Sequence, residues 1–164
     1  MQILVKNNYL YANEKSFRCS IGSGGLTNKK REGDHCTPIG NFKFDKIYYR
    51  ADKLGEMDFA ISSASISNND GWCDDPYSRY YNQFIEFPFS GNAEKLYRED
   101  DLYDIVCVIN YNTKPIIPGN GSAIFLHVCS EKFDTTEGCI AVEKNVLLEI
   151  SKLITPNSNI VIDS

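Results

Sequence analysis

A cysteine that follows a glycine is the feature of this sequence that best fits nucleophilic chemistry. Cys139 comes directly after Gly138, between a polar segment and the short apolar stretch 140–142. A thiol at such a junction can be approached by a substrate, and the neighbouring backbone N–H groups can face a developing oxyanion. A free cysteine is more often a small buried hydrophobic residue, so both interpretations stay open on local sequence alone.

His127 is the candidate base, because the chain contains only two histidines, His35 and His127. Strand alternation along 121–130 places His127 on one face with Phe125, and Leu126 on the opposite face. A histidine in an apolar strand needs partners for its ring nitrogens, and a backbone carbonyl would suffice. A pair with Cys139 would explain both residues, and an imidazolium beside the sulfur would lower the pKa of the thiol.

The other five cysteines are weaker candidates for a nucleophile. Cys73 precedes Asp74 and Asp75, whose negative charge would disfavour a thiolate. These two carboxylates could form an acid–base pair, although such a pair before a proline more often holds a turn. No two cysteines have C-x-x-C spacing, which argues against a zinc knuckle.

Runs of β-branched and aromatic residues predict the elements that must position these side chains. Strands are expected at 1–5, 16–22, 40–49, 57–62, 102–111 and 121–130, with a last strand within 155–163. Hydrophobic residues on one helical face predict a single helix over 143–154. Residues 63–82 are dense in Ser, Asn, Asp and Gly and predict a long functional loop. The fold class is therefore mainly β with one C-terminal helix packed on the sheet.

The composition is that of an ordinary globular protein. The 164 residues, 42% hydrophobic and 24% charged, predict a single domain over 1–164. A net charge of −5 argues against nucleic-acid binding. No apolar run approaches the roughly 20 residues of a membrane span. The first residues lack the pattern of a secretory signal, so a cytoplasmic location, export by another route and a signal outside this sequence are the alternatives.

Several segments together resemble the L,D-transpeptidase (YkuD-like) catalytic domain. Thr37-Pro38-Ile39-Gly40 with Phe42 is similar to the family's T-P-x-G-x-F segment. His127, followed by a loop and then Gly138-Cys139, resembles the family's active-site motif. The order of these motifs, with segments 31–34, 71–76, 102–104 and 121–127, resembles a short, often standalone branch over about residues 22–162.

The resemblance implies a β-sandwich-like fold and cysteine-dependent acyl transfer on peptidoglycan stem peptides. Cross-linking or D-amino acid exchange would pass through a thioester on Cys139, with His127 as the base and amides around Gly138 forming the oxyanion hole. No cofactor and no metal are implied, and carbapenem-type β-lactams would be inhibitors. The substrate class implies the cell envelope or periplasm. A hydrolase on the same site and a non-catalytic peptidoglycan-binding domain are the alternatives.

The sequence departs from the family pattern around the nucleophile and the base. Glu137 stands where a His usually precedes Gly-Cys, Ala141 stands where an Arg often follows, and Val128 follows the base. A cation that holds a substrate carboxylate must therefore come from elsewhere, and Lys30, Arg31, Arg79 and Arg98 are the candidates. The residues expected to contact substrate are Arg31, Trp72, Asp74, Asp75 and Glu137, and aromatic residues of 63–82 are expected to shield the thioester from water.

Overall fold

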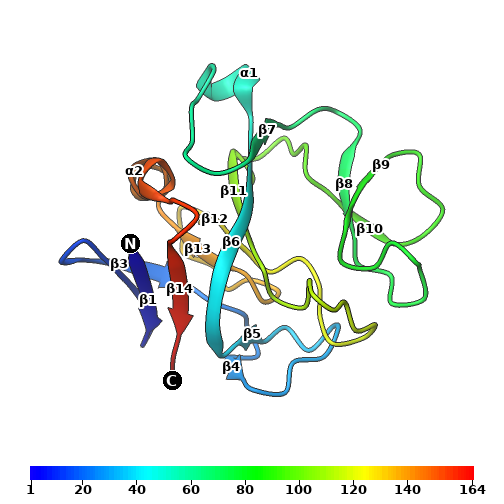
Figure 1. Ribbon diagram of the computed structural model, residues 1–164, viewed down its shortest axis with the longest axis horizontal. Coiled ribbons are helices and arrows are strands. Elements are labelled where there is room, and N and C mark those ends of the chain that lie inside the picture. Colours follow the sequence, from blue (N-terminus) through cyan, green and yellow to red (C-terminus); the bar gives the residue numbers. More distant parts are fainter.

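Short strands make up most of the regular structure in the computed structural model, which describes residues 1–164 (Figure 1). Two helices, α1 (Ala51–Leu54) and α2 (Lys144–Leu153), accompany them, and neither is long and apolar enough to cross a membrane. The strands are β1 (Gln2–Lys6), β2 (Tyr9–Ala12), β3 (Lys15–Ser20), β4 (Leu26–Thr27), β5 (Thr37–Pro38), β6 (Gly40–Tyr49), β7 (Ser63–Ser65), β8 (Asp70–Cys73), β9 (Phe84–Glu86), β10 (Ala93–Lys95), β11 (Ile105–Ile109), β12 (Phe125–Val128), β13 (Ile140–Val142) and β14 (Asn159–Ile162).

One nine-stranded sheet forms the body of the molecule. Its order is β11-β12-β13-β3-β2-β1-β14-β6-β7, and β11 pairs with β6 as well. This additional pairing closes the sheet on itself and leaves β7 attached to β6 alone. A three-stranded sheet, β10-β8-β9, lies apart from this body on the right of Figure 1, and β4 pairs with β5.

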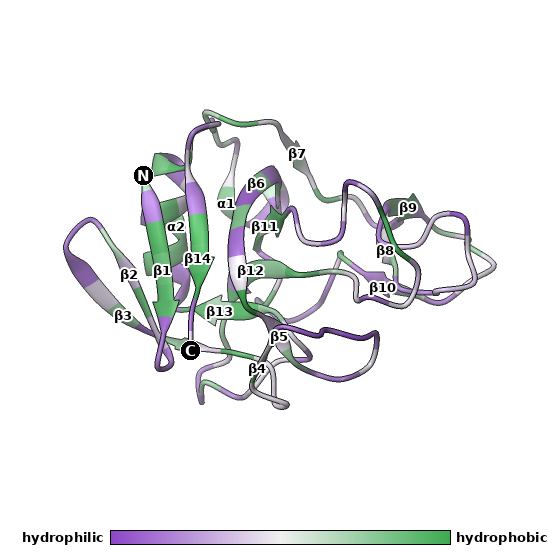
Figure 2. Ribbon diagram, turned by 60° about the horizontal axis from the view of Figure 1, so that its bottom comes forward, coloured by the Kyte–Doolittle hydropathy of each residue, from purple (hydrophilic) through white to green (hydrophobic).

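Two hydrophobic clusters divide the core. The larger cluster of 21 residues includes Ile3 of β1, Ile160 of β14, and Leu147 and Ile150 of α2. Figure 2 shows hydrophobic residues along β1 and β14. A smaller cluster of 9 residues, including Phe125, contains residues of the main sheet together with residues of the β8 region.

The two faces of β12 contact different clusters, as strand alternation predicts. Leu126 and Val128 belong to the larger cluster, whereas Phe125 belongs to the smaller cluster together with Cys139. The face of Phe125 is also the face of His127, because side chains alternate along a strand. The smaller cluster therefore lies beside the candidate nucleophile and base.

The predicted mainly β fold with a C-terminal helix is confirmed, whereas two local predictions are wrong. Residues 57–62 form no strand, and 63–82 is not a continuous loop because it contains β7 and β8. Met57, Phe59 and Ile61 alternate along the chain because they pack against the larger cluster, but 57–62 has no strand partner. The pairing partners explain the second error. β7 pairs with β6, and β8 pairs with β9 and β10, so long-range hydrogen bonds override the polar local composition.

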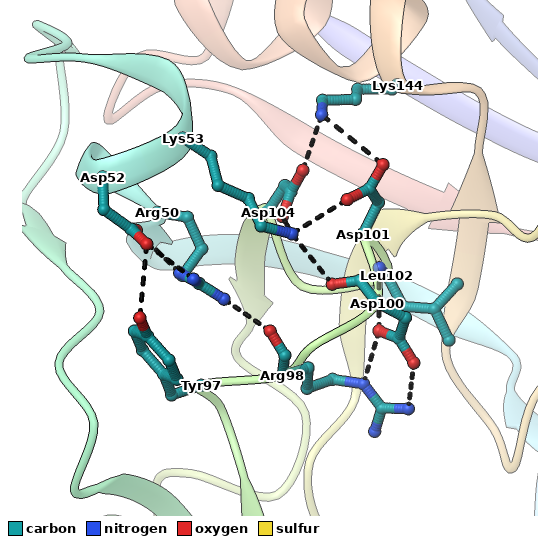
Figure 3. A network of polar contacts seen from close by, with 10 residues as sticks. All are labelled: Arg50, Asp52, Lys53, Tyr97, Arg98, Asp100, Asp101, Leu102, Asp104 and Lys144. Carbon is teal, nitrogen blue, oxygen red and sulfur yellow. Dashed lines mark hydrogen bonds and ion pairs between the residues drawn. The ribbon is translucent and has the colours of Figure 1, made fainter.

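Asp104 connects both helices to the start of β11 (Figure 3). Its fully buried carboxylate accepts hydrogen bonds from Lys53 Nζ of α1 at 2.9 Å and from Lys144 Nζ of α2 at 2.6 Å. Its backbone carbonyl accepts a hydrogen bond from Arg50 N at 2.9 Å. The network fixes the segment that leads from the pocket region into β11.

We expect Asp104→Asn to lower the free energy of unfolding by about 1–3 kcal/mol, because two lysines lose their buried anionic partner. Glu149→Gln is the matched control. Glu149 pairs with Lys15 at 2.8 Å, and their side chains are 48% and 58% exposed, so its loss should cost less than about 1 kcal/mol. Urea unfolding at neutral pH measures both values, and equal losses would contradict the role assigned to Asp104.

Candidate active site

Cys139 and His127 line one pocket of about 440 Å³. They reach it because β12 and β13 pair in parallel, with Leu126 opposite Ile140 and His127 opposite Ala141. Cys139 directly precedes β13 and lies on the same side of the sheet as Ala141. The structure thus brings together the two side chains that the sequence singles out for nucleophilic chemistry.

The thiol of Cys139 is buried and hydrogen-bonded. Its Sγ donates to the carbonyl of Ala123 at 3.1 Å and accepts a hydrogen bond from Phe125 N at 3.4 Å, and the residue is only 8% exposed. Burial raises the pKa of the Cys139 thiol well above its ordinary value, and the negative charge of Glu94 adds to this shift. The expectation that the site lowers the pKa of this thiol is therefore wrong, and the resting form is the neutral thiol.

His127 is a buried, neutral imidazole. Its Nδ1 lies 2.8 Å from the backbone carbonyl of Val128, so a neutral ring that donates from Nδ1 has its lone pair on Nε2. Tyr103 packs edge-on against the ring, with centroids 5.2 Å apart. Burial lowers the pKa of His127 to about 4, although the carbonyls of Val128 and Leu102 oppose the shift. The orienting contact for the base thus comes from the backbone.

The turn before Cys139 depends on Gly138 and one hydroxyl group. Thr136 Oγ1 accepts a hydrogen bond from Gly138 N at 3.1 Å and donates to the carbonyl of Cys139 at 2.6 Å. Gly138 has a φ of +136°, and a Cβ atom built there would lie 2.8 Å from the backbone oxygen of Cys36. Only glycine fits this backbone without strain.

Thr37 ties this turn to a distant part of the chain. Its side chain is fully buried, and its Oγ1 accepts a hydrogen bond from Gly22 N at 2.9 Å and donates to the carbonyl of Gly138 at 2.8 Å. The Thr-Pro segment thus has a physical role, because its hydroxyl satisfies two buried backbone groups next to the nucleophile.

The charged groups that line the pocket are mostly acidic. Burial, together with the charge of Glu32, raises the pKa of Asp74, and burial raises the pKa of Glu94 even though Tyr103 donates a hydrogen bond to it. Arg98 is the only lysine or arginine in the lining. The lining carboxyl groups, called here the acidic lining, belong to Glu32, Asp74, Glu94, Asp134 and Glu137.

Of the residues expected to contact substrate, Asp74 and Glu137 line the pocket, and three others do not. Trp72 is buried, and its Nε1 donates to Asn82 Oδ1 at 3.0 Å. Asp75 accepts hydrogen bonds from two backbone N–H groups and holds a turn. Arg31 is exposed and lies outside the lining.

The four candidates for a substrate-binding cation differ in position. Lys30 is buried and bonds Asp34 at 2.5 Å, and Arg79 lies at the surface over the ring of Tyr80. Arg31 is exposed. Arg98 reaches the pocket, but its guanidinium already holds both carboxylate oxygens of Asp100, at 2.8 and 2.7 Å.

Sequence reasoning misses several residues that shape the site. Glu32 accepts hydrogen bonds from Tyr81 OH and from Ser122 Oγ, the latter at 2.7 Å. Asn82 Oδ1 accepts a hydrogen bond from the backbone N–H of Ala123 at 3.0 Å and so fixes the segment that bonds the thiol. Ala123 has a φ of +53°, an uncommon value for a residue with a side chain. No local pattern marks these residues, because each acts across a long sequence separation.

Comparison with known proteins gives one matching family model and two solved structures of low similarity. The family model for the L,D-transpeptidase catalytic domain matches residues 3–162. L,D-transpeptidase 1 of Mycobacterium tuberculosis aligns with 99% of this chain at 10% identity and a TM-score of 0.46. The helical cell shape determining protein Pgp2 of Campylobacter jejuni aligns with 99% at 15% identity and a TM-score of 0.44. The chain spans 58% and 47% of these two structures, and no curated protein matches.

We expect Thr37→Val to destabilise the fold by about 1–3 kcal/mol, because Gly22 N and the Gly138 carbonyl would lose their partner without a change in side-chain size. Thr37→Ser is the control, since it keeps both hydrogen bonds and should lose only about 1 kcal/mol for the missing methyl group. Urea unfolding compares the two variants. A valine variant as stable as the wild-type chain would show that these hydrogen bonds contribute nothing.

The pKa of about 4 for His127, below its ordinary value of 6.5, predicts a pH-dependent stability. Between these values the unfolded chain binds a proton at this residue and the folded chain does not, so stability falls as pH drops through the window. His127→Gln should remove this part of the pH dependence. NMR titration of the His127 ring in a His35→Gln background should give a midpoint near 4. A midpoint at or above 6.5, the ordinary pKa of histidine, would contradict the assignment of a neutral imidazole to His127.

Proposed function

The chain belongs to the L,D-transpeptidase catalytic domain family, and from this membership we propose that it transfers acyl groups on peptidoglycan stem peptides with Cys139 as the nucleophile. The observation that carries the proposal is the position of His127 on β12 and of Cys139 directly before the paired strand β13, with both side chains in the lining of one pocket. A buried thiol beside a buried neutral imidazole fits nucleophilic catalysis with a general base.

The proposed reaction begins from the neutral pair. The S–H group turns from the Ala123 carbonyl toward the imidazole, and Nε2 of His127 takes the proton as sulfur attacks the donor carbonyl. The new C–S bond gives a tetrahedral intermediate, and the C–N bond then breaks while His127 returns the proton to the leaving amine. An acceptor amine attacks the thioester, passes its proton to His127, and releases the thiol, which regains that proton.

Hydrolysis is the second candidate, and one observation favours it. The aromatic residues of 63–82 were expected to shield the thioester from water, yet none of them lines the pocket. Trp72 and Tyr81 are buried in the fold, and Tyr77 is 97% exposed. This segment does not close the pocket, so water could replace the amine as acceptor.

The proposed substrate also bears on location and inhibition. We propose that the reaction takes place in the cell envelope as part of cell wall biogenesis, because peptidoglycan stem peptides are found there. Carbapenem-type β-lactams are proposed inhibitors, because attack of the Cys139 thiol on their strained carbonyl would form an acyl-enzyme at the same site.

We expect Cys139→Ala to abolish turnover of a tetrapeptide muropeptide, and His127→Gln to slow it by about 10²–10⁴-fold, because proton transfer in the transition state is lost. Cys36→Ser is the control, since Cys36 is half-buried and the serine hydroxyl can replace its contacts with the Gly24 and Asp34 carbonyls. Full activity of the Cys139→Ala variant would refute the assignment of Cys139 as the nucleophile. No turnover by the wild-type chain would favour a binding domain.

Mass analysis of the products separates transfer from hydrolysis. The muropeptide is incubated with and without an added D-amino acid, at several acceptor concentrations. Exchange products that rise with acceptor support the transferase, because amine and water compete for one thioester. Tripeptide as the main product at every acceptor concentration would instead support the hydrolase.

A further inference from the structure

Lys30 is a buried charged residue that the proposed reaction does not use. Its side chain is only 4% exposed, and it is the only buried lysine of the chain. Its Nζ donates hydrogen bonds to Asp34 Oδ1 at 2.5 Å and to the carbonyl of Arg31 at 3.1 Å. A buried ion pair is often no more stable than apolar side chains of similar size, so stability alone does not explain an ammonium at this position.

The aliphatic part of Lys30 lies beside the two turns that hold Cys139. A Cβ atom built at Gly121 would lie 2.7 Å from Cγ and 3.1 Å from Cε of Lys30, and one built at Gly138 would lie 3.6 Å from Cε. Gly138 directly precedes Cys139. Gly121 lies two residues before Ala123, whose carbonyl accepts the hydrogen bond from the thiol. The carbon that carries the ammonium is therefore next to both turns that position the proposed nucleophile.

The charge of Lys30 opposes the effects that keep the thiol of Cys139 neutral. Burial and the charge of Glu94 raise the pKa of this thiol. The hydrogen bond from Phe125 N and the charge of Lys30 both lower it. Water screens charges weakly between buried groups, so an opposite charge there favours a thiolate more than it would at the surface. Lys30 does not line the pocket, so its charge acts on the sulfur without contact with a bound substrate.

We propose that the Lys30 ammonium stabilises the negative charge that develops at Cys139 during attack, from behind the Gly138 turn and without contact with substrate. Sulfur carries part of this charge as its proton leaves, and the oxyanion that faces the amides around Gly138 carries it after the C–S bond forms. Lys30 keeps its proton throughout. The inference rests on the proposed function and adds to it an electrostatic role for a residue outside the pocket lining. Stabilisation that exists only while charge develops lowers the barrier and does not strengthen substrate binding.

Substitutions on the two sides of the ion pair test the inference. Lys30→Met removes the positive charge and keeps a long, unbranched side chain, whereas Asp34→Asn removes the negative partner and leaves the ammonium uncompensated. An electrostatic role predicts opposite effects on Cys139, because the two variants change the local charge in opposite directions. A purely structural role of the ion pair predicts the same effect from both variants, because each breaks the same contact.

Alkylation by iodoacetamide, an uncharged reagent, measures the effect on the thiol without a peptidoglycan substrate. The thiolate of Cys139 forms a C–S bond to the reagent and releases iodide, and peptide mapping gives the rate at this residue. At a fixed, mildly alkaline pH the rate follows the thiolate fraction. We expect Lys30→Met to slow labelling of Cys139 by about tenfold, which corresponds to one pKa unit, and Asp34→Asn to accelerate it by about threefold.

Lys15→Met is the matched control. Lys15 pairs with Glu149 at 2.8 Å and its side chain is 58% exposed, so this variant changes the net charge equally and should leave the labelling rate unchanged. Labelling of Lys30→Met as fast as that of the wild-type chain, or labelling of Asp34→Asn no faster than that of the wild-type chain, would overturn the inference. If circular dichroism shows that Lys30→Met does not fold, the rate of Asp34→Asn decides alone.

Turnover of a tetrapeptide muropeptide separates this inference from the proposed function. Lys30→Met should lower kcat by about tenfold and leave KM unchanged, because Lys30 does not line the pocket and acts only on developing charge. An unchanged kcat, in a chain that does turn over the substrate, overturns the inference and leaves the proposed function standing. Opposite labelling effects of the two variants in a chain without turnover support the role of the Lys30 charge at Cys139 and overturn the proposed function.

Discussion

The parallel pairing of β12 with β13 is the constraint on which the site depends. Because His127 lies opposite Ala141, and side chains two residues apart share a face, Cys139 and His127 enter the same pocket. A tight hairpin cannot join parallel strands, so the chain crosses over through residues 129–139. This crossover also forms one wall of the pocket, and its last turn is held by the hydroxyls of Thr136 and Thr37. The connection that the strand pairing requires is therefore also the segment that presents Cys139, the proposed nucleophile.

Burial of both reacting groups determines their charge at rest. Cys139 and His127 lie beside aromatic residues of the smaller cluster, where water cannot solvate an ion well. The pKa of the thiol rises and the pKa of the imidazole falls, and both shifts favour the neutral form. An ion pair formed before substrate arrives would have to offset this desolvation. In the proposed reaction, charge would therefore separate only when a substrate carbonyl is present to accept the electron pair from sulfur.

Local periodicity predicts those parts of the structure that depend on neighbouring residues. The face of β12 that holds His127 and Phe125 follows from alternation, and the C-terminal helix follows from its apolar face. Residues 63–73 are mispredicted as a loop because β7 and β8 exist only through partners elsewhere in the chain. Local sequence patterns do not predict the acidic lining either, because Glu32, Asp74 and Glu94 come from separate segments. The direction of the thiol's pKa shift depends on burial, which the Gly-Cys sequence does not reveal.

A protonated thiol and an acidic pocket have one common consequence for selectivity. The thiolate is the reactive form of cysteine, so a thiol whose pKa is raised reacts slowly with small oxidants and electrophiles. Glu94 contributes to that raised pKa through its negative charge. In the proposed reaction, attack on a bound carbonyl passes the electron pair on to the carbonyl oxygen, so negative charge does not have to stay on the buried sulfur. The burial and the neighbouring charge that keep Cys139 unreactive at rest would thus make its activation depend on the substrate.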